Sequence, residues 1–205
     1  AGATIGILGG GQLGRMLSVA ASRLGFRCHV FDPDPGAPAA HVADRLTTAG
    51  YDDIAALSAF AQSVDVITYE FENIPTAALD ALEAVRPIHP NRRALATRQE
   101  RMAEKDFLNG IGLQTAPYAR VTGMDDLEAA VARIGMPAIL KTNRLGYDGK
   151  GQARIMTTAD APAAWAAMMG AGAVLGGFIA VSQEVSVIAA RGTDGETLSP
   201  LELGA

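Results

Sequence analysis

The stretch that decides the fold is Thr4–Met16, with the sequence TIGILGGGQLGRM. Its apolar beginning has the composition of a buried β-strand, and the residues after it have a helical pattern. Between the two, Gly9, Gly11 and Gly14 form a complete G-x-G-x-x-G motif. At a strand-to-helix turn this motif is the dinucleotide-binding fingerprint, but the motif alone does not identify the ligand. The rest of the chain has to show which ligand the turn binds.

The first 90 residues alternate β-rich runs with helical patterns. The predicted strands cover residues 3–8, 26–32 and 65–71, and the predicted helices cover residues 13–24, 51–64 and 74–85. This order predicts βαβ units in a three-layer, Rossmann-like α/β domain with a mostly parallel sheet. In such a sheet ligands bind at the carboxyl ends of the strands, where Gly9–Gly14, Asp32 and Glu70 all lie.

The sequence changes character after Pro90, and we predict a domain boundary there, with domains at 1–90 and 91–205. The second part begins with a long, charged helical stretch at 91–108. Three further features are predicted: a helix around Leu127–Ile134, a strand, glycine-rich turn and strand over 137–156, and a strand in 183–201 with a turn at Asp194 and Gly195. The second glycine-rich turn therefore joins two strands, unlike the first.

Composition and charge limit the classes of function. A chain of 205 residues with 49% hydrophobic residues can bury a large core, which indicates an ordinary globular protein. The formal net charge of -5 disfavours general binding to nucleic acids or membrane surfaces, because both need a basic face. The single cysteine, Cys28, lies in an apolar run that predicts a buried thiol. With no pattern of a targeting or membrane-spanning segment, we expect a cytoplasmic protein with no nucleic-acid or membrane partner.

A second glycine cluster follows a lysine at the end of a predicted strand. In AILK, Lys141 emerges from the strand, and Gly146, Gly149 and Gly151 follow in the turn. Bare glycine backbone can fold closely over an anion, so this turn suits a triphosphate. It is not a P-loop, because Gly151 and Gln152 begin a strand rather than a helix. A β-hairpin with solvent-facing lysines is the alternative interpretation.

Five segments together carry a family resemblance: GILGGGQLGRML, VITYEFENIP, ERMAEKDFL, LKTNRLGYDGKGQ and EVSVIAARG. In this order they resemble the N5-carboxyaminoimidazole ribonucleotide synthetase family of the ATP-grasp superfamily, from about residue 4 to about residue 200. The resemblance implies a Rossmann-like pre-ATP-grasp domain followed by a partial ATP-grasp α+β domain. It also implies that the first glycine motif helps to hold a ribonucleotide instead of NAD, and that Asp32 only imitates the ribose-binding acid of a dinucleotide fold.

The activity implied by the resemblance is that of a ligase of purine biosynthesis. ATP, bicarbonate and 5-aminoimidazole ribonucleotide would give N5-carboxyaminoimidazole ribonucleotide, ADP and phosphate. ATP would first convert bicarbonate into carboxyphosphate, so the protein would mainly neutralise charge, position the reactants and exclude water. ATP and Mg²⁺ are the implied cofactors, and the implied assembly is a homodimer.

The resemblance also implies roles for individual residues. Arg101 and Lys141 would contact the ATP phosphates, and Glu184 would accept hydrogen bonds from the ribose hydroxyls. The residues implied for nucleotide binding are Arg101, Lys141, Gly146, Tyr147, Asp148, Gly149, Lys150, Gly151, Gln152, Gly176, Gly177, Phe178, Ile179 and Glu184. The residues implied for catalysis are Lys141, Tyr147 and Asp148, and those implied for binding the ribonucleotide are Gln12, Leu13 and Glu70.

Other interpretations of several of these residues stay open. Arg101 and Lys105 lie one helical turn apart, which is also typical of a solvated helix surface. Glu70 and Glu72 lie on one face of a predicted strand, as an ordinary solvent-facing pair would. The three histidines lack the spacing of metal ligands, so we expect no metal site from them.

Two departures from the family pattern keep other functions open. Gly176 stands where the family usually has a glutamate, at the start of the segment that contacts adenine. The family's Mg²⁺ carboxylates and the basic residues for the substrate phosphate lie beyond the matched region. We therefore expect a fragment or a shortened protein. The alternative functions are a non-catalytic module that keeps ligand binding and, on Gly9–Gly14 and Asp32 alone, a NAD-binding oxidoreductase domain.

Overall fold

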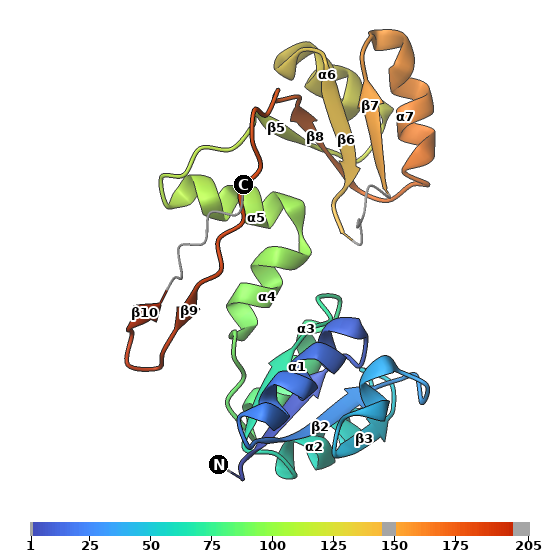
Figure 1. Cartoon of the computed structure of the whole chain (residues 1–205). Coiled ribbons are helices and arrows are strands. Elements are labelled where there is room, and N and C mark those ends of the chain that lie inside the picture. The colour runs from blue at the N-terminus through green and yellow to red at the C-terminus, as the bar shows by residue number, and fades with distance from the viewer. Residues whose placement is uncertain (1, 145–150, 199–205) are drawn as a thin grey trace.

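The N-terminal part of the chain forms a parallel sheet of four strands in the order β3-β2-β1-β4 (Figure 1). The computed structural model describes residues 2–144 and 151–198. The strands are β1 (Thr4–Leu8), β2 (Arg27–Asp32), β3 (Arg45–Thr48) and β4 (Val66–Tyr69). The predicted Rossmann-like parallel sheet is confirmed. The sequence gives little sign of β3, because its RLTT sequence has one apolar residue, and β3 forms through its pairing with β2.

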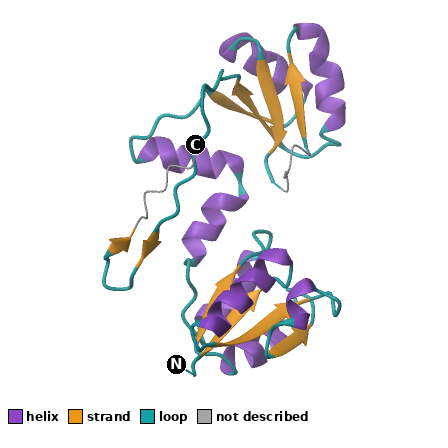
Figure 2. Cartoon of the chain, in the orientation of Figure 1, coloured by secondary structure: helices purple, strands orange, loops and turns teal. Residues whose placement is uncertain are grey.

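Helices cover both faces of this sheet (Figure 2). They are α1 (Gln12–Arg23), α2 (Ile54–Gln62), α3 (Thr76–Glu83) and the short 3-10 helix η1 (Pro38–His41). Successive strand residues point to opposite faces, so Ile7 and Leu8 of β1 belong to different core clusters. Cys28 is buried on the face that Ile7 shares, as predicted, and this burial raises the pKa of its thiol.

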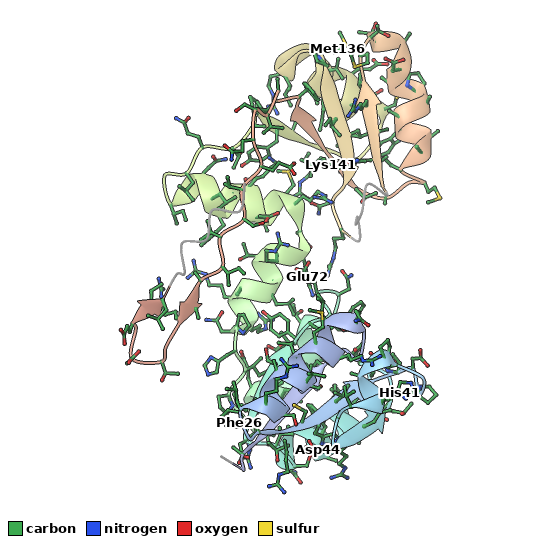
Figure 3. The ribbon with its side chains drawn as sticks, viewed as in Figure 1. Phe26, His41, Asp44, Glu72, Met136 and Lys141 are labelled. Atoms are coloured by element: carbon green, nitrogen blue, oxygen red, sulfur yellow. The ribbon has the colours of Figure 1, made fainter. Side chains whose placement is uncertain are left out.

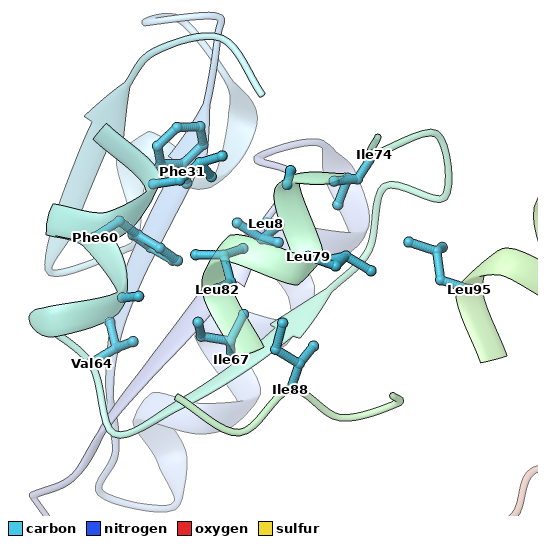
Figure 4. Close-up of a cluster of buried hydrophobic side chains, with 13 residues drawn as sticks. Leu8, Phe31, Phe60, Val64, Ile67, Ile74, Leu79, Leu82, Ile88 and Leu95 are labelled. Atoms are coloured by element: carbon cyan, nitrogen blue, oxygen red, sulfur yellow. The ribbon is translucent and has the colours of Figure 1, made fainter. Parts of the chain in front are cut away.

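The larger N-terminal cluster lies on the face covered by α2 and α3 (Figure 4). Phe31 of β2 and Phe60 of α2 pack edge to face, with their ring centroids 5.4 Å apart. Leu95, which lies beyond the predicted boundary at Pro90, is also fully buried in the cluster.

Two helices, α4 (Arg92–Gln99) and α5 (Arg101–Gly110), lie between the N-terminal domain and a second sheet (Figure 1). The prediction of a single helical stretch over 91–108 is therefore wrong, because the backbone is extended at Glu100, with φ -122° and ψ 119°. The N–H groups of Arg101 and Met102 bond to Asn143 instead of to α4 carbonyls. Leu95 of α4 packs with the N-terminal core, and the domain boundary at Pro90 stays a prediction.

The second sheet is antiparallel, with the order β5-β8-β6-β7. Its strands are β5 (Tyr118–Val121), β6 (Ala138–Thr142), β7 (Gln152–Ile155) and β8 (Ala173–Gly177). The helices that pack with it are α6 (Met124–Ile134), α7 (Ala161–Ala167) and the short 3-10 helix η2 (Thr158–Asp160). Val121, Leu127 and Leu140 lie at the centre of its core. The predicted helix around Leu127 and the two predicted strands, β6 and β7, are confirmed, and the α+β class with them, while most of the predicted glycine-rich turn lies outside the described residues.

The last described segment forms little regular structure. Its two strands, β9 (Ala190–Arg191) and β10 (Thr197–Leu198), form a short antiparallel pair. The predicted turn at Asp194 and Gly195 is confirmed, and Gly195 has φ +89°. The strand predicted before this turn is wrong for residues 183–189, which are exposed and pair with no strand in the described ranges. In those same ranges, no helix is both long enough and apolar enough to cross a bilayer.

Candidate functional site

The first glycine turn connects β1 to α1 in a tight conformation. Gly9 has φ +101°, a backbone region that favours glycine. At Gly14, an added Cβ would lie 2.4 Å from the carbonyl oxygen of Gly9, so α1 approaches the turn too closely for any side chain at this position. The glycine spacing of the motif therefore has a steric basis in the packing of α1 against its own turn.

Two carboxylates of the same domain accept hydrogen bonds from the amide groups of this turn. The Gly10 N–H donates to Asp32 Oδ2 at 2.7 Å, and the Gly11 N–H donates to Glu70 Oε1 at 2.8 Å. In a dinucleotide fold the pyrophosphate binds to the N–H groups at this end of the helix. Here the positions are filled by negative side chains, which would also repel a pyrophosphate. The geometry therefore disfavours the dinucleotide interpretation.

The three residues predicted for the ribonucleotide lie together at the start of α1. Gln12 and Leu13 are the first residues of the helix, and both are exposed. Glu70 contacts the preceding Gly11 from the end of β4 and is half-buried. The structure thus brings the three residues to one edge of the sheet. Their role as ribonucleotide ligands stays a prediction.

An aromatic pair beside these carboxylates was not found from the sequence. The rings of Tyr51 and Phe71 stack with centroids 5.6 Å apart. Burial raises the pKa of Tyr51, and the negative charges of Asp32 and Glu70 raise it further. The signal available in the sequence was an aromatic residue at the end of a predicted strand, which is visible for Phe71. Tyr51 follows β3, the strand that the sequence analysis missed.

The second candidate site is a cavity of about 130 Å³ between α5 and one face of the second sheet. Its lining residues are Arg101, Glu104, Lys105, Ala116, Ile139, Lys141, Val174, Gly176 and Gly177. Strand alternation explains the lining, because Leu140 faces the core while its neighbours Ile139 and Lys141 face the cavity. On the neighbouring strand β8, Gly176 pairs with Ile139 and Val174 pairs with Lys141, so the same face of the sheet continues onto β8.

Three cationic side chains line this cavity. Arg101 and Lys105 come from successive turns of α5, and Lys141 comes from β6. Burial lowers the pKa of the Lys105 ammonium, and the charges of Lys141 and Arg101 lower it further, although Glu104 acts in the opposite direction. Within residues 2–144 and 151–198, Lys105 forms no ion pair. The cavity therefore has a net positive lining, which suits a polyanion.

Lys105 is a cavity residue that the sequence analysis did not select. Its ammonium lies 5.1 Å from the centroid of the Tyr118 ring, whose hydroxyl donates to Asp106 Oδ1 at 2.6 Å. A solvated helix surface, the alternative interpretation of Arg101 and Lys105, is therefore wrong for Lys105. The spacing of four residues from Arg101 was the available signal, since it places both side chains on one side of α5.

The segment predicted for adenine begins at the edge of the same cavity. Gly176 and Gly177 line the cavity, whereas Phe178 and Ile179 are exposed beyond it. The Gly177 N–H donates to the Pro117 carbonyl, and the Phe178 N–H donates to the Pro137 carbonyl. Both amides are therefore engaged by the protein, so a base would have to use carbonyl groups or the Ile179 N–H.

The structure describes only some of the other residues predicted to bind the nucleotide. Gly146, Tyr147, Asp148, Gly149 and Lys150 lie outside the described residues. After them, Gly151 has φ +67°, and an added Cβ there would lie 2.7 Å from Thr142 Oγ1. Gln152 is exposed and pairs with Lys141 across the β6–β7 ladder, next to the cavity. Glu184 is exposed and is absent from the lining of the described cavity.

Comparisons with known proteins agree with this arrangement. A ribonucleotide synthetase pre-ATP-grasp domain model matches residues 2–99, and an ATP-grasp domain model matches residues 106–200. The N5-carboxyaminoimidazole ribonucleotide synthase of Brucella melitensis is 49% identical over 196 residues, which are 95% of this chain and 54% of that protein. The chain belongs to the N5-carboxyaminoimidazole ribonucleotide synthetase family.

Solved structures of this family resemble the chain over most of its length. The Staphylococcus aureus N5-carboxyaminoimidazole synthetase complexed with ADP has a TM-score of 0.93 and 36% identity, and the match covers 97% of this chain and 53% of that one. The Aspergillus clavatus synthase in complex with ADP and 5-aminoimidazole ribonucleotide has a TM-score of 0.86 and 29% identity, over 97% and 52% of the two chains. The chain spans about half the length of the curated relatives that it matches.

The described residues do not fit the Mg²⁺ that ATP chemistry in this synthetase family implies. Among them, no group of three or more His, Cys, Asp or Glu side chains is arranged to hold a metal ion. Within the described ranges, the carboxylate that lines the cavity is Glu104, and it forms an ion pair with Arg98. Because Mg²⁺ is held mainly by carboxylate oxygens and water, the cavity lining described here is not a Mg²⁺ site.

Proposed function

We propose that this chain carries the nucleotide and ribonucleotide surfaces of an ATP-dependent carboxylase of purine biosynthesis. The overall reaction is ATP, bicarbonate and 5-aminoimidazole ribonucleotide giving N5-carboxyaminoimidazole ribonucleotide, ADP and phosphate. The γ-phosphoryl group moves to bicarbonate and forms carboxyphosphate, and the ribonucleotide amine then attacks the activated carboxyl carbon and releases phosphate. The names and bound ligands of the family members support this reaction.

The observation that carries the proposal is the cationic cavity on the second sheet. Arg101, Lys105 and Lys141 face one space, and the carboxylate that lines it among the described residues, Glu104, is already paired with Arg98. The charges of Lys141 and Arg101 lower the pKa of the half-buried Lys105 ammonium, and a bound negative charge would relieve this repulsion. A nucleotide polyphosphate supplies that charge, and the apolar side chains of Ile139 and Val174 offer a surface for a base.

The ribonucleotide is proposed to bind at the other glycine turn. Gln12 and Leu13 are exposed at the start of α1, and Glu70 fixes the turn through Gly11. The Aspergillus clavatus structure, which contains 5-aminoimidazole ribonucleotide, supports a ribonucleotide site in this fold. Because Asp32 and Glu70 already bind the turn amides, we assign its ligand contacts to exposed side chains rather than to those N–H groups.

The chemistry that this chain supplies is charge neutralisation and positioning. Lys141 is proposed to stabilise charge on the transferring phosphoryl group, and Tyr147 and Asp148 stay as proposed catalytic residues of the loop that follows. The residues from Gly146 to Gln152 are proposed to exclude water from carboxyphosphate, and those from Gly176 to Ile179 are proposed to contact adenine. Glu184 is proposed for the ribose hydroxyls. No step is assigned to Mg²⁺.

A second candidate is a binding module that does not turn over. The observation in its favour is the absence, within the described residues, of a carboxylate cluster for the metal that phosphoryl transfer uses. Such a module would bind ATP at the same cavity but would release no phosphate. The two candidates therefore predict equal binding and different turnover.

One assay separates these candidates. The protein is incubated with ATP, Mg²⁺, bicarbonate carrying labelled carbon and 5-aminoimidazole ribonucleotide, and phosphate release and carbon incorporation are followed together. Ribonucleotide-dependent release of one phosphate per carboxylated product supports the carboxylase. ATP binding by calorimetry without phosphate release supports the module, and saturable NADH binding with no ATP binding contradicts both. Lys141→Met, which removes a cavity charge, is the matched control for specific ATP binding.

The assembly and compartment are also part of the proposal. We propose a cytoplasmic homodimer, which the family resemblance supports. Sedimentation equilibrium of the purified chain tests the assembly, and a monomer at micromolar concentrations would contradict it.

A further inference from the structure

Gln99 is a buried polar residue that connects the two candidate sites. It ends α4 and has 7% of its surface exposed. Its Nε2 donates to the carbonyls of Glu72 at 2.8 Å and Ile74 at 2.7 Å. Its Oε1 accepts from Arg144 Nη2 at 2.9 Å. The orientation of the amide is fixed by its neighbours, because two carbonyls require donors and a guanidinium requires an acceptor.

The partners of Gln99 belong to the two functional regions described above. Glu72 and Ile74 follow Glu70, the residue that fixes the first glycine turn, and we name residues 70–74 the ribonucleotide loop. Arg144 follows β6, the strand that carries Lys141. Figure 3 shows Glu72 on the N-terminal domain and Lys141 on β6. One side chain thus contacts both regions.

The corner between α4 and α5 strengthens this connection. The Arg101 N–H and Nε donate to the carbonyls of Asn143 and Thr142, at 3.0 and 2.9 Å. The Met102 N–H donates to Asn143 Oδ1 at 3.1 Å, so a residue that follows β6 caps the start of α5. The extended residue between Gln99 and Arg101 allows the corner to bond residues 72–74 on one side and 142–144 on the other.

A surface ion-pair chain runs parallel to the buried link. Arg98 contacts Glu72 at 3.3 Å and also pairs with Glu104, which lines the cationic cavity. Arg98 and Glu72 are more than half exposed, and exposed pairs contribute little because water and salt screen them. The buried amide is therefore the stronger of these two connections, since breaking it leaves polar groups without partners away from water.

We propose that Gln99, together with Arg144, is a positioning residue that holds the ribonucleotide loop and the Lys141 strand in one relative arrangement. The geometric link stands on the contacts alone, and its role in catalysis rests on the function proposed above. In that reaction an amine bound at one domain must reach a carboxyl group activated at the other. A displacement of about 1 Å in such an arrangement lowers rates strongly, so the link affects turnover more than binding of either ligand.

The first test measures the relative position of the domains without any ligand. Spin labels are placed on introduced cysteines at two exposed helix positions, Gln62→Cys and Glu128→Cys, and the distance distribution is recorded. The native Cys28 is 2% exposed and will not take the label. We expect the distribution to become at least twofold wider in Gln99→Met and in Arg144→Met.

Control variants distinguish positioning from general loosening. Arg93→Met removes the same charge from α4 but touches neither region, since Arg93 lies over the Phe107 ring; it should leave the width unchanged. Arg144→Lys retains one donor for Gln99 and should restore most of the narrow distribution. Arg144 is about half exposed, so Arg144→Met keeps the test valid if Gln99→Met does not fold. An unchanged width in Arg144→Met, or equal broadening in Arg93→Met, overturns the proposal.

The second test uses turnover. If the chain, or the protein containing it, is active, Arg144→Met should lower kcat about tenfold and change KM for ATP and for the ribonucleotide less than twofold. A rise in KM as large as the fall in kcat would indicate damage to a binding site and overturn the positioning role. Broadened distances in a protein that binds neither ligand would support the link and contradict the proposed function, so the two failures are distinguishable.

Discussion

The two candidate sites of this chain treat negative charge in opposite ways. At the first glycine turn, the amides of Gly10 and Gly11 are already bonded to Asp32 and Glu70. In the second-sheet cavity, Arg101, Lys105 and Lys141 face a space where the described part of the chain supplies one carboxylate, Glu104, which pairs with Arg98. The first turn is stabilised by its own anions, whereas the described lining of the second site suits an anion from outside. A glycine motif therefore identifies a close backbone approach, and the surrounding charges decide the ligand.

The largest expected effect tests the steric half of this comparison. Gly14→Ala would place a methyl group 2.4 Å from the Gly9 carbonyl oxygen, so either α1 or the turn must move. We expect a loss of about 3 kcal/mol in the free energy of unfolding, near the upper end for overpacking a tight site. Urea denaturation followed by circular dichroism measures this change.

A glycine with free space provides the control for Gly14. At Gly110, the last residue of α5, an added Cβ meets nothing within 4 Å. Gly110→Ala should leave stability unchanged or raise it by up to about 1 kcal/mol, because alanine favours helix. Equal stability in Gly14→Ala and the parent protein would show that the first turn does not depend on close approach.

The second prediction uses pH to separate the two domains. His29 is 2% exposed and contacts Ser63 Oγ and Thr47 Oγ1, and burial, together with the charge of Arg45, lowers its pKa from 6.5 to about 4. The unfolded chain then binds more protons between pH 6.5 and 4. Stability is complete above pH 6.5 and should fall by on the order of 3 kcal/mol as the pH approaches 4.

The histidines make this pH test specific to the first domain. All three histidines of the chain lie in its first 90 residues. His29→Gln should flatten the pH dependence between 6.5 and 4, while His41→Gln, at an exposed position, should leave it unchanged. An NMR titration in which the His29 ring protonates near pH 6.5 in the folded protein would disprove the assignment.

Sequence patterns predicted what local periodicity and motif spacing control. The parallel sheet, the glycine turn with Glu70 beside it, and the position of Lys141 on a strand were all predicted. The break at Glu100 was not, because it depends on hydrogen bonds to Asn143, more than forty residues away. Lys105 was left as a surface residue, since its burial arises only when α5 packs over β6 and β8. Contacts between distant segments were the part that periodicity does not encode.

The third prediction tests the electrostatic half of the comparison. Lys105→Met should weaken ATP binding about tenfold, or about 1.4 kcal/mol, as expected for losing one charged contact in a half-buried site. Arg120→Met, at an exposed position on β5, removes the same charge outside the cavity and should change the affinity less than twofold. Calorimetric titration measures both variants. If adenosine binding falls as much as ATP binding in Lys105→Met, the lysine acts on cavity shape and not on phosphate.

The smallest expected effect concerns Gly176, a glycine without a steric requirement. An added Cβ there would have the Ile139 carbonyl oxygen as its nearest neighbour, at 3.9 Å, and the residue is paired with Tyr118 and Ile139 in the sheet. Gly176→Ala should therefore change the free energy of unfolding by less than about 0.5 kcal/mol. Alanine lowers the backbone entropy of the unfolded chain, and its methyl group meets no clash in the sheet. The new methyl group points toward the cavity, so it should lower ATP affinity measurably only if the base packs against β8. Thermal unfolding and ATP titration of the same variant measure the two effects separately. A destabilisation comparable with Gly14→Ala would show that both glycine regions are sterically closed, and the difference between them would then be one of charge alone.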